Sequence, residues 1–141
     1  MKSLMVGAIA LVSALAFLGA PGAAASRTCF GHKATIVGTN GDDHLVGTAG
    51  RDIIVAGRGH DRVNARRGND LVCGGPGFDE LFLGRGADKA NAGRGADSVE
   101  GFRGNDHIEG RGGQDFLDGG GGTDRLNGGA DRDTCLSLIH I

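Results

Sequence analysis

Several residue types are scarce or missing in this chain of 141 residues. It contains no Trp and no Tyr, six Phe, two Pro and three Cys. So few large side chains exclude a conventional globular domain with a wide aromatic core. Although 29 residues are glycine, the low proline count and the lack of a three-residue glycine period exclude a collagen-like helix. A different glycine-rich repeat must therefore organise the chain.

The two ends of the chain differ from its middle. Lys2 precedes an apolar run over residues 4–18, a Gly/Pro break and three alanines at residues 23–25. This order predicts a signal peptide over residues 1–25 and a secreted, extracellular protein, because a membrane anchor needs a longer unbroken apolar span. The last peptide, LSLIHI at residues 136–141, matches one translated frame of a common transposase sequencing adapter. We therefore expect a library artefact there, which resequencing without that adapter would test.

An aspartate recurs every nine residues from Asp43 to Asp133, with no insertion or deletion. A glycine lies two residues before each aspartate except Asp133, and an apolar residue or a cysteine lies two residues after each. The unit approximates G-G-x-G-x-D-x-U-x, where U is apolar. Closely spaced glycines favour a tight loop, and x-U-x favours a short strand. We therefore expect six residues of turn and three of strand per unit, with two units closing each turn of a solenoid.

In such a solenoid the aspartates recur on one edge every second unit, so their carboxylates form columns. Unpaired like charges at this spacing repel each other, and a hard cation between successive turns removes the repulsion. Carboxylate and carbonyl oxygens are the ligands that Ca²⁺ prefers, whereas Mg²⁺ needs stricter octahedral geometry. The predicted cofactor is thus Ca²⁺. The predicted ligands are Asp43, Asp52, Asp61, Asp70, Asp79, Asp88, Asp97, Asp106, Asp115 and Asp124.

With this spacing and these residues, the segment 38–135 resembles the RTX (repeats-in-toxin) nonapeptide repeats. The resemblance implies an all-β fold, a right-handed parallel β-roll of about eleven repeats. It also implies that same-edge loops share each ion, so that Asp43 would act with Asp61 and Asp52 with Asp70. We expect a secreted calcium-binding β-roll that folds when it binds Ca²⁺ and has a structural or cell-surface role.

Besides the missing glycine before Asp133, the repeats depart from the usual RTX composition at the first three positions of the unit. Where glycine is replaced at the first or second position, we expect the loop to bind calcium more weakly. The first-position replacements are Ala56, Ala65, Leu83 and Ala92, and the second-position ones are Thr39, Thr48, Arg66, Phe102 and Arg111. The third position holds arginine at Arg58, Arg67, Arg85, Arg94 and Arg103. These arginines either attach a cationic, calcium-loaded rod to anionic cell-envelope polymers or are solvated side chains that screen the aspartates, and we favour the second interpretation.

The three cysteines favour a disulfide in an oxidising compartment. An apolar patch of outward positions, which includes Cys73, lies beside the N-terminal end of the predicted roll. Residues 26–37 are therefore predicted to fold back as an N-terminal cap, with Cys29 bonded to Cys73 or either of them bonded to Cys135. The C-x-x-H of Cys29 and His32 resembles half of a zinc site, but no second close pair completes it.

A catalytic function is not expected, because only residues 26–37 lie between the predicted signal peptide and the repeats. The histidines have no nucleophile at a motif spacing. The alternatives are an N-terminal fragment of a longer RTX adhesin, or of a secreted hydrolase whose catalytic domain is missing, and the length of the complete gene separates them. The expected partners are calcium ions and anionic envelope polymers. We expect a monomer, no transmembrane segment and no sequence-specific binding of nucleic acid.

Overall fold

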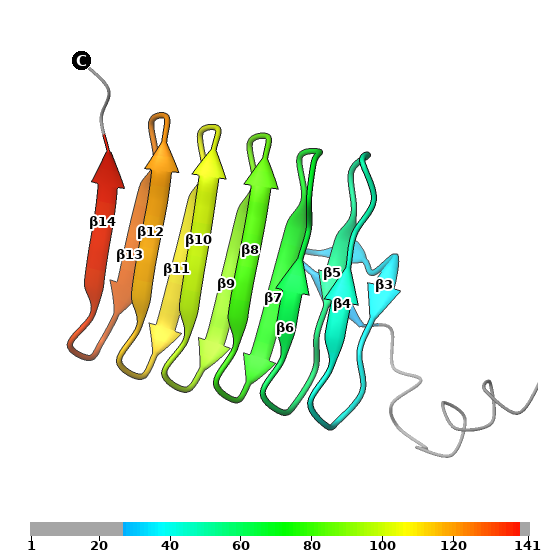
Figure 1. Ribbon diagram of the computed structural model, residues 1–141. Coiled ribbons are helices and arrows are strands. Elements are labelled where there is room, and N and C mark those ends of the chain that lie inside the picture. Colours follow the sequence, from blue (N-terminus) through cyan, green and yellow to red (C-terminus); the bar gives the residue numbers. More distant parts are fainter. Residues whose placement is uncertain (1–26, 139–141) are drawn as a thin grey trace, which may run out of the picture.

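The computed structural model describes residues 27–138 and forms a solenoid of two parallel β-sheets that face each other (Figure 1). The predicted signal peptide lies outside these residues, as do residues 139–141. The even-numbered sheet contains β4 (His44–Val46), β6 (Arg62–Asn64), β8 (Glu80–Arg85), β10 (Ser98–Arg103), β12 (Phe116–Gly121) and β14 (Thr134–Leu138). The odd-numbered sheet contains β3 (Ile36–Val37), β5 (Ile53–Val55), β7 (Leu71–Pro76), β9 (Lys89–Arg94), β11 (His107–Gly112) and β13 (Arg125–Gly129).

Neighbouring strands within each sheet are related by two repeat units. Val99 of β10 is paired with Leu81 of β8 and with Leu117 of β12, all in parallel register. In the other sheet, Ile108 is paired with Ala90 and Leu126. Because each partner lies eighteen residues along the chain, two nine-residue units form one turn. The predicted all-β, parallel β-roll is therefore confirmed.

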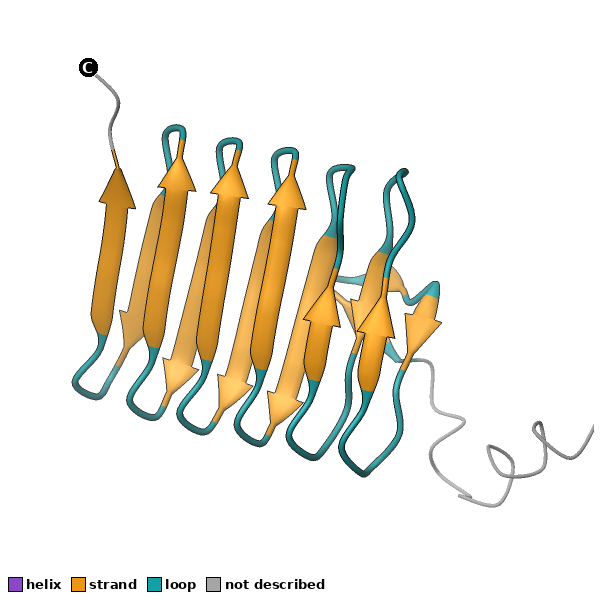
Figure 2. Cartoon of the chain, in the orientation of Figure 1, coloured by secondary structure: helices purple, strands orange, loops and turns teal. Residues whose placement is uncertain are grey.

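Strands and connecting turns make up the described part of the chain (Figure 2). Within it, we find no helix of the length and apolarity needed to span a bilayer.

The core consists of inward side chains from two positions of each unit. The apolar eighth position supplies fully buried residues, such as Leu81 and Ile108. The first position also points inward, and wherever it is not glycine its side chain is fully buried, as at Leu83 and Ala92. From sequence, these first-position replacements are expected only to weaken calcium binding by their loops. In the structure they add side chains to the apolar core between the sheets.

Most strands are longer than the three residues predicted from the repeat. From β7 to β12 each strand has six residues, because the first three positions of the next unit continue the ladder. The three-residue expectation holds for β4, β5 and β6. After β3 and β4, the N–H groups of Thr39 and Thr48 donate instead to the aspartate of their own loop, so they cannot extend the ladder.

A short antiparallel hairpin, β1 (Thr28–Cys29) and β2 (His32–Lys33), precedes the solenoid. Cys29 is buried and forms a disulfide with Cys73 on the outer face of β7. The structure thus selects this pairing from those left open by the sequence, and it leaves Cys135 as an exposed free cysteine. The hairpin lies against β5 and β7, so it covers part of an outer sheet face, while β3 forms the end of the odd-numbered sheet.

The loops of successive turns approach each other backbone to backbone. Gly86 has a φ of +141°, and a Cβ placed there would overlap the carbonyl oxygen of Gly68 in the preceding same-edge loop. The same overlap would occur at the fourth-position glycine of other units, including Gly77 and Gly104. Glycine is required there because any side chain would push neighbouring turns apart.

We predict that Gly86→Ala lowers the free energy of unfolding by about 3 kcal/mol or more, because it combines a disfavoured φ with a backbone clash. Gly112→Ala is the matched control, since a Cβ at Gly112 meets nothing within 4 Å. Chemical denaturation of both variants in excess calcium measures the difference. Equal stability of the two variants would contradict the close approach of the loops.

Candidate metal centre

The predicted ligands stand in two columns, one along each edge of the solenoid where the chain turns from one sheet to the other. Each aspartate lies immediately before a strand, so its position is fixed by the ladder that begins at the next residue. The backbone N–H of Asp70 donates to Oδ1 of Asp88 (2.7 Å), and the N–H of Asp88 donates to Oδ1 of Asp106 (2.9 Å). The same bond repeats along both columns from Asp43 to Asp133.

The second carboxylate oxygen differs from the first along most of both columns. In seven aspartates Oδ2 is buried and has no hydrogen-bond partner among the described residues. A buried carboxylate oxygen without a partner is costly in free energy. The seven are Asp61, Asp70, Asp79, Asp88, Asp97, Asp106 and Asp115.

The three remaining predicted ligands lie at the ends of the columns and have other surroundings. Oδ2 of Asp43 accepts the N–H of Thr39 at 2.6 Å. Oδ2 of Asp52 likewise accepts the N–H of Thr48 at 2.6 Å. Asp124 is only partly buried, and its Oδ2 lies 3.4 Å from the hydroxyl of Ser137. The Oδ2 atoms of these three carboxylates therefore have protein donors, whereas the Oδ2 atoms of the seven central ones have none in the described part of the chain.

Backbone carbonyl groups provide further oxygen atoms beside the columns. The carbonyl oxygens of the fourth-position glycines face the next turn, as the close approach of Gly86 to Gly68 shows. Between Gly59 and Gly104, none of these carbonyls accepts a backbone hydrogen bond in the described part of the chain. No group of three or more His, Cys, Asp or Glu side chains suited to a metal occurs among the described residues. A cation here would therefore use backbone carbonyls as well as carboxylates.

Burial changes the acid–base behaviour of the columns. Desolvation is the main cause that raises the pKa of Asp79 and of Asp88 to about 7, and the neighbouring carboxylates of each column raise it further. The N–H donated by the preceding aspartate acts in the opposite direction and lowers the pKa. Desolvation similarly raises the pKa of Asp70, Asp97 and Asp106 to about 6 and raises that of Asp61 and Asp115.

This donor set fits a hard divalent cation. Stacked carboxylates, each with one oxygen fixed by an N–H and the other open, supply negative charge in a poorly hydrated place, and uncommitted carbonyls supply neutral oxygen ligands. Soft metals are disfavoured because the columns contain no thiolate or imidazole. Sequence analysis anticipated the columns but not the N–H to Oδ1 chain within them, since no side-chain pattern encodes a bond to the main chain.

Comparison with known protein families agrees with this geometry. The family model for the RTX calcium-binding nonapeptide repeat matches residues 37–72, 74–99 and 100–135. Searches of curated proteins and of solved structures give no significant match. The three matched segments span most of the chain and nearly all of the solenoid. The chain therefore belongs to the family of RTX calcium-binding nonapeptide repeat proteins.

Proposed function

We propose that this chain is a secreted β-roll that folds when it binds Ca²⁺ and serves a structural or cell-surface role. The observation that carries the proposal is the set of seven buried Oδ2 atoms without a partner among the described residues. With both columns ionised and no cation, like charges would face each other one turn apart, about 4.8 Å along the stack. Bound Ca²⁺ supplies the positive charge that makes the folded columns favourable.

Within this proposal the seven central aspartates are the main ligands, and neighbours on the same edge share an ion. Asp70 would act with Asp88, and Asp79 with Asp97. Asp43 and Asp52 contribute less, because threonine N–H groups already satisfy their Oδ2 atoms. The binding strength expected for extracellular calcium modules, a Kd of about 10⁻⁴ to 10⁻³ M, suits a protein that stays unfolded at the low calcium concentration inside the cell.

Two of the described histidines make contacts that favour a structural role over a catalytic one. The ring of His60 stacks on Phe78 with 4.9 Å between centroids, and its Nδ1 accepts the N–H of Phe78. His107 lies 3.3 Å from the carboxylate of Glu109. These contacts fix the rings on the surface of the repeats, and we propose no catalytic role for them.

At pH 8, we expect the mature chain to be disordered in excess chelator and to fold cooperatively as calcium rises into the millimolar range. Circular dichroism follows folding, and isothermal titration calorimetry gives the number of ions bound. Magnesium at the same concentration is the control and should give little folding, because its octahedral demand suits these loops poorly. The same β-sheet signal with and without chelator would refute calcium-dependent folding.

Replacing a central ligand should weaken this response. We predict that Asp88→Asn raises the calcium concentration at half-folding about tenfold, which corresponds to about 1.4 kcal/mol, because the amide keeps an oxygen for the N–H of Asp70 but loses the charge. Glu100→Gln is the matched control, since Glu100 lies on the outer face of β10, away from the columns. A titration midpoint that moves equally in both variants would contradict the assignment of Asp88.

The raised pKa values also predict that the stability of the calcium-free fold depends on pH. Between the ordinary carboxyl pKa of 3.8 and about 7, the folded chain binds more protons than the unfolded chain. The contribution of these groups to stability is therefore complete below pH 3.8 and is lost as pH rises through the folded-state pKa.

In chelator, we accordingly expect more folded protein at pH 5 than at pH 8, measured by circular dichroism. Calcium affinity should change in the opposite direction and fall as pH drops below about 7, because protons compete for the same oxygens. A double variant, Asp79→Asn with Asp88→Asn, should show a smaller pH effect in chelator. A fold that becomes less stable on acidification in chelator would contradict the burial of the columns.

A further inference from the structure

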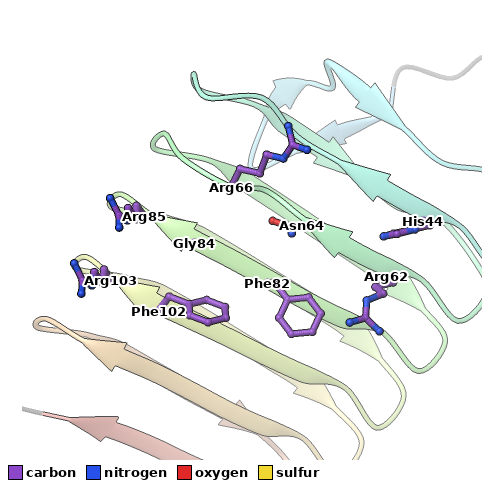
Figure 3. A pocket seen from close by; sticks show the side chains of 9 residues that line it. All are labelled: His44, Arg62, Asn64, Arg66, Phe82, Gly84, Arg85, Phe102 and Arg103. Carbon is purple, nitrogen blue, oxygen red and sulfur yellow. The ribbon is translucent and has the colours of Figure 1, made fainter.

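The outer face of the even-numbered sheet carries a groove of about 500 Å³ across β4, β6, β8 and β10 (Figure 3). It lies outside the sheet, away from the inward core and from the aspartate columns at the turns. We call it the arginine–phenylalanine groove. Its principal lining residues are Arg62, Arg66, Arg85, Arg103, Phe82 and Phe102.

The groove concentrates positive charge that the protein itself leaves largely unneutralised. Arg62 forms an ion pair with Glu80 at 3.0 Å. Among the described residues, Arg66, Arg85 and Arg103 form no ion pair. Arg85 and Arg103 end the neighbouring strands β8 and β10, and Arg66 lies just after β6. Figure 3 shows Arg85 and Arg103 side by side at one end of the groove. Such a row of like charges is complementary to a chain of anions.

Two aromatic rings lie next to the arginines. The centroids of Phe82 and Phe102 are 6.3 Å apart, and the rings are tilted by 42°. The guanidinium carbon of Arg62 lies 5.1 Å from the centroid of Phe82, a cation–π contact. Phe102 is 47% exposed, so nearly half of this apolar side chain is accessible to a flat ligand.

Two of the four described non-glycine residues with a positive φ line this groove. Arg66 has a φ of +79° and Phe102 a φ of +73°, at the second position of the repeat, where Gly84 lies between them with a φ of +104°. Strained residues of this kind collect at functional sites. Arg111 is also strained, with a φ of +86°, but it lies on the opposite sheet and has its own ion-pair partner in Glu109 at 2.7 Å. Arg66 has no ion-pair partner among the described residues, and both Arg66 and Phe102 line the groove.

The hydrogen-bonding chemistry of the groove distinguishes between classes of anion. Arginine carries only donors, and four of the lining side chains are arginines; Asn64 and His44 provide the few side-chain acceptors. Sugar hydroxyls require acceptors as well as donors, whereas the oxygens of a phosphodiester require donors alone and match the guanidinium fork. The exposed ring of Phe102 adds a surface on which a flat base stacks. Phosphates and flat rings occur together in single-stranded nucleic acid.

We propose that the arginine–phenylalanine groove binds single-stranded nucleic acid without sequence preference. The arginines hold successive phosphates, and a base stacks on Phe102, beside the ring of Phe82. A single strand is required because a duplex keeps its base faces stacked inside. This activity is additional to calcium binding, and it depends on calcium only because the sheet must be folded to form the groove.

The proposal is tested with the mature, calcium-saturated chain and a fluorescein-labelled dT12 oligonucleotide, by fluorescence anisotropy. We expect saturable binding that weakens about 20-fold between 50 and 200 mM salt if about three phosphates are held. An unlabelled duplex should compete poorly, and single strands of other sequences should compete as well as dT12. No rise in anisotropy at low salt would overturn the proposal.

Two groove variants and two matched controls locate the site. Phe102→Gly should weaken binding about 5- to 150-fold, while raising the thermal midpoint of the calcium-loaded protein because the φ strain is removed. Arg85→Ala should reduce both the affinity and its salt dependence. The controls are Phe78→Ala, which removes a ring that is 59% exposed outside the groove, and Arg94→Ala, on β9 of the opposite sheet. Equal losses in groove and control variants would overturn the assignment.

Competition by a polymer without bases separates this proposal from general attraction to anions. Polygalacturonate should displace dT12 only weakly, and to the same extent from the parent chain and from Phe102→Gly. If it competes as well as dT12, and Phe102→Gly binds dT12 normally, the surface binds polyanions in general and the proposal fails. The number of calcium ions bound by each variant, measured by calorimetry, should not fall. Failure of this proposal is therefore distinguishable from failure of calcium binding.

Discussion

The rest of this structure depends on one repeated hydrogen bond, from the N–H of one aspartate to the carboxylate of the aspartate one turn later. The bond fixes the distance between turns at both edges, and it orients each carboxylate so that only one oxygen is satisfied. The sheets keep their register because the ladder begins at the residue that follows each aspartate. The fold and the proposed calcium site therefore use the same carboxylates.

The close packing of the loops follows from this arrangement. Turns held together by a bond between main chain and carboxylate leave no room for a Cβ at the fourth position of the unit, as Gly86 shows. The core between the sheets is correspondingly thin, and small or medium side chains such as Ala90 and Leu83 fill it. The scarcity of aromatic residues is thus a requirement of this architecture: large rings fit only on the outside, where Phe82 and Phe102 lie.

The nine-residue period was sufficient to predict the strand pairing, because a solenoid without insertions sets its register by repeat length alone. It also predicted which aspartates share an edge. It could not predict the inward position of Leu83, because that depends on the strand continuing into the next unit. The satisfied Oδ2 of Asp52 depends on the local backbone at Thr48. Phe82 and Phe102 occupy different positions of the repeat, so the period does not align them, and only the folded sheet brings them together.

The disulfide between Cys29 and Cys73 makes the N-terminal end of the solenoid different from its C-terminal end. It closes a covalent loop around the first turns, where threonine N–H groups already satisfy the carboxylates of Asp43 and Asp52. Solenoid turns interact mainly with their neighbours, so order spreads from whichever turns form first. The cross-link therefore favours the N-terminal turns as the place where order begins. If the chain folds on calcium as proposed, later turns would then add to these first turns in sequence order.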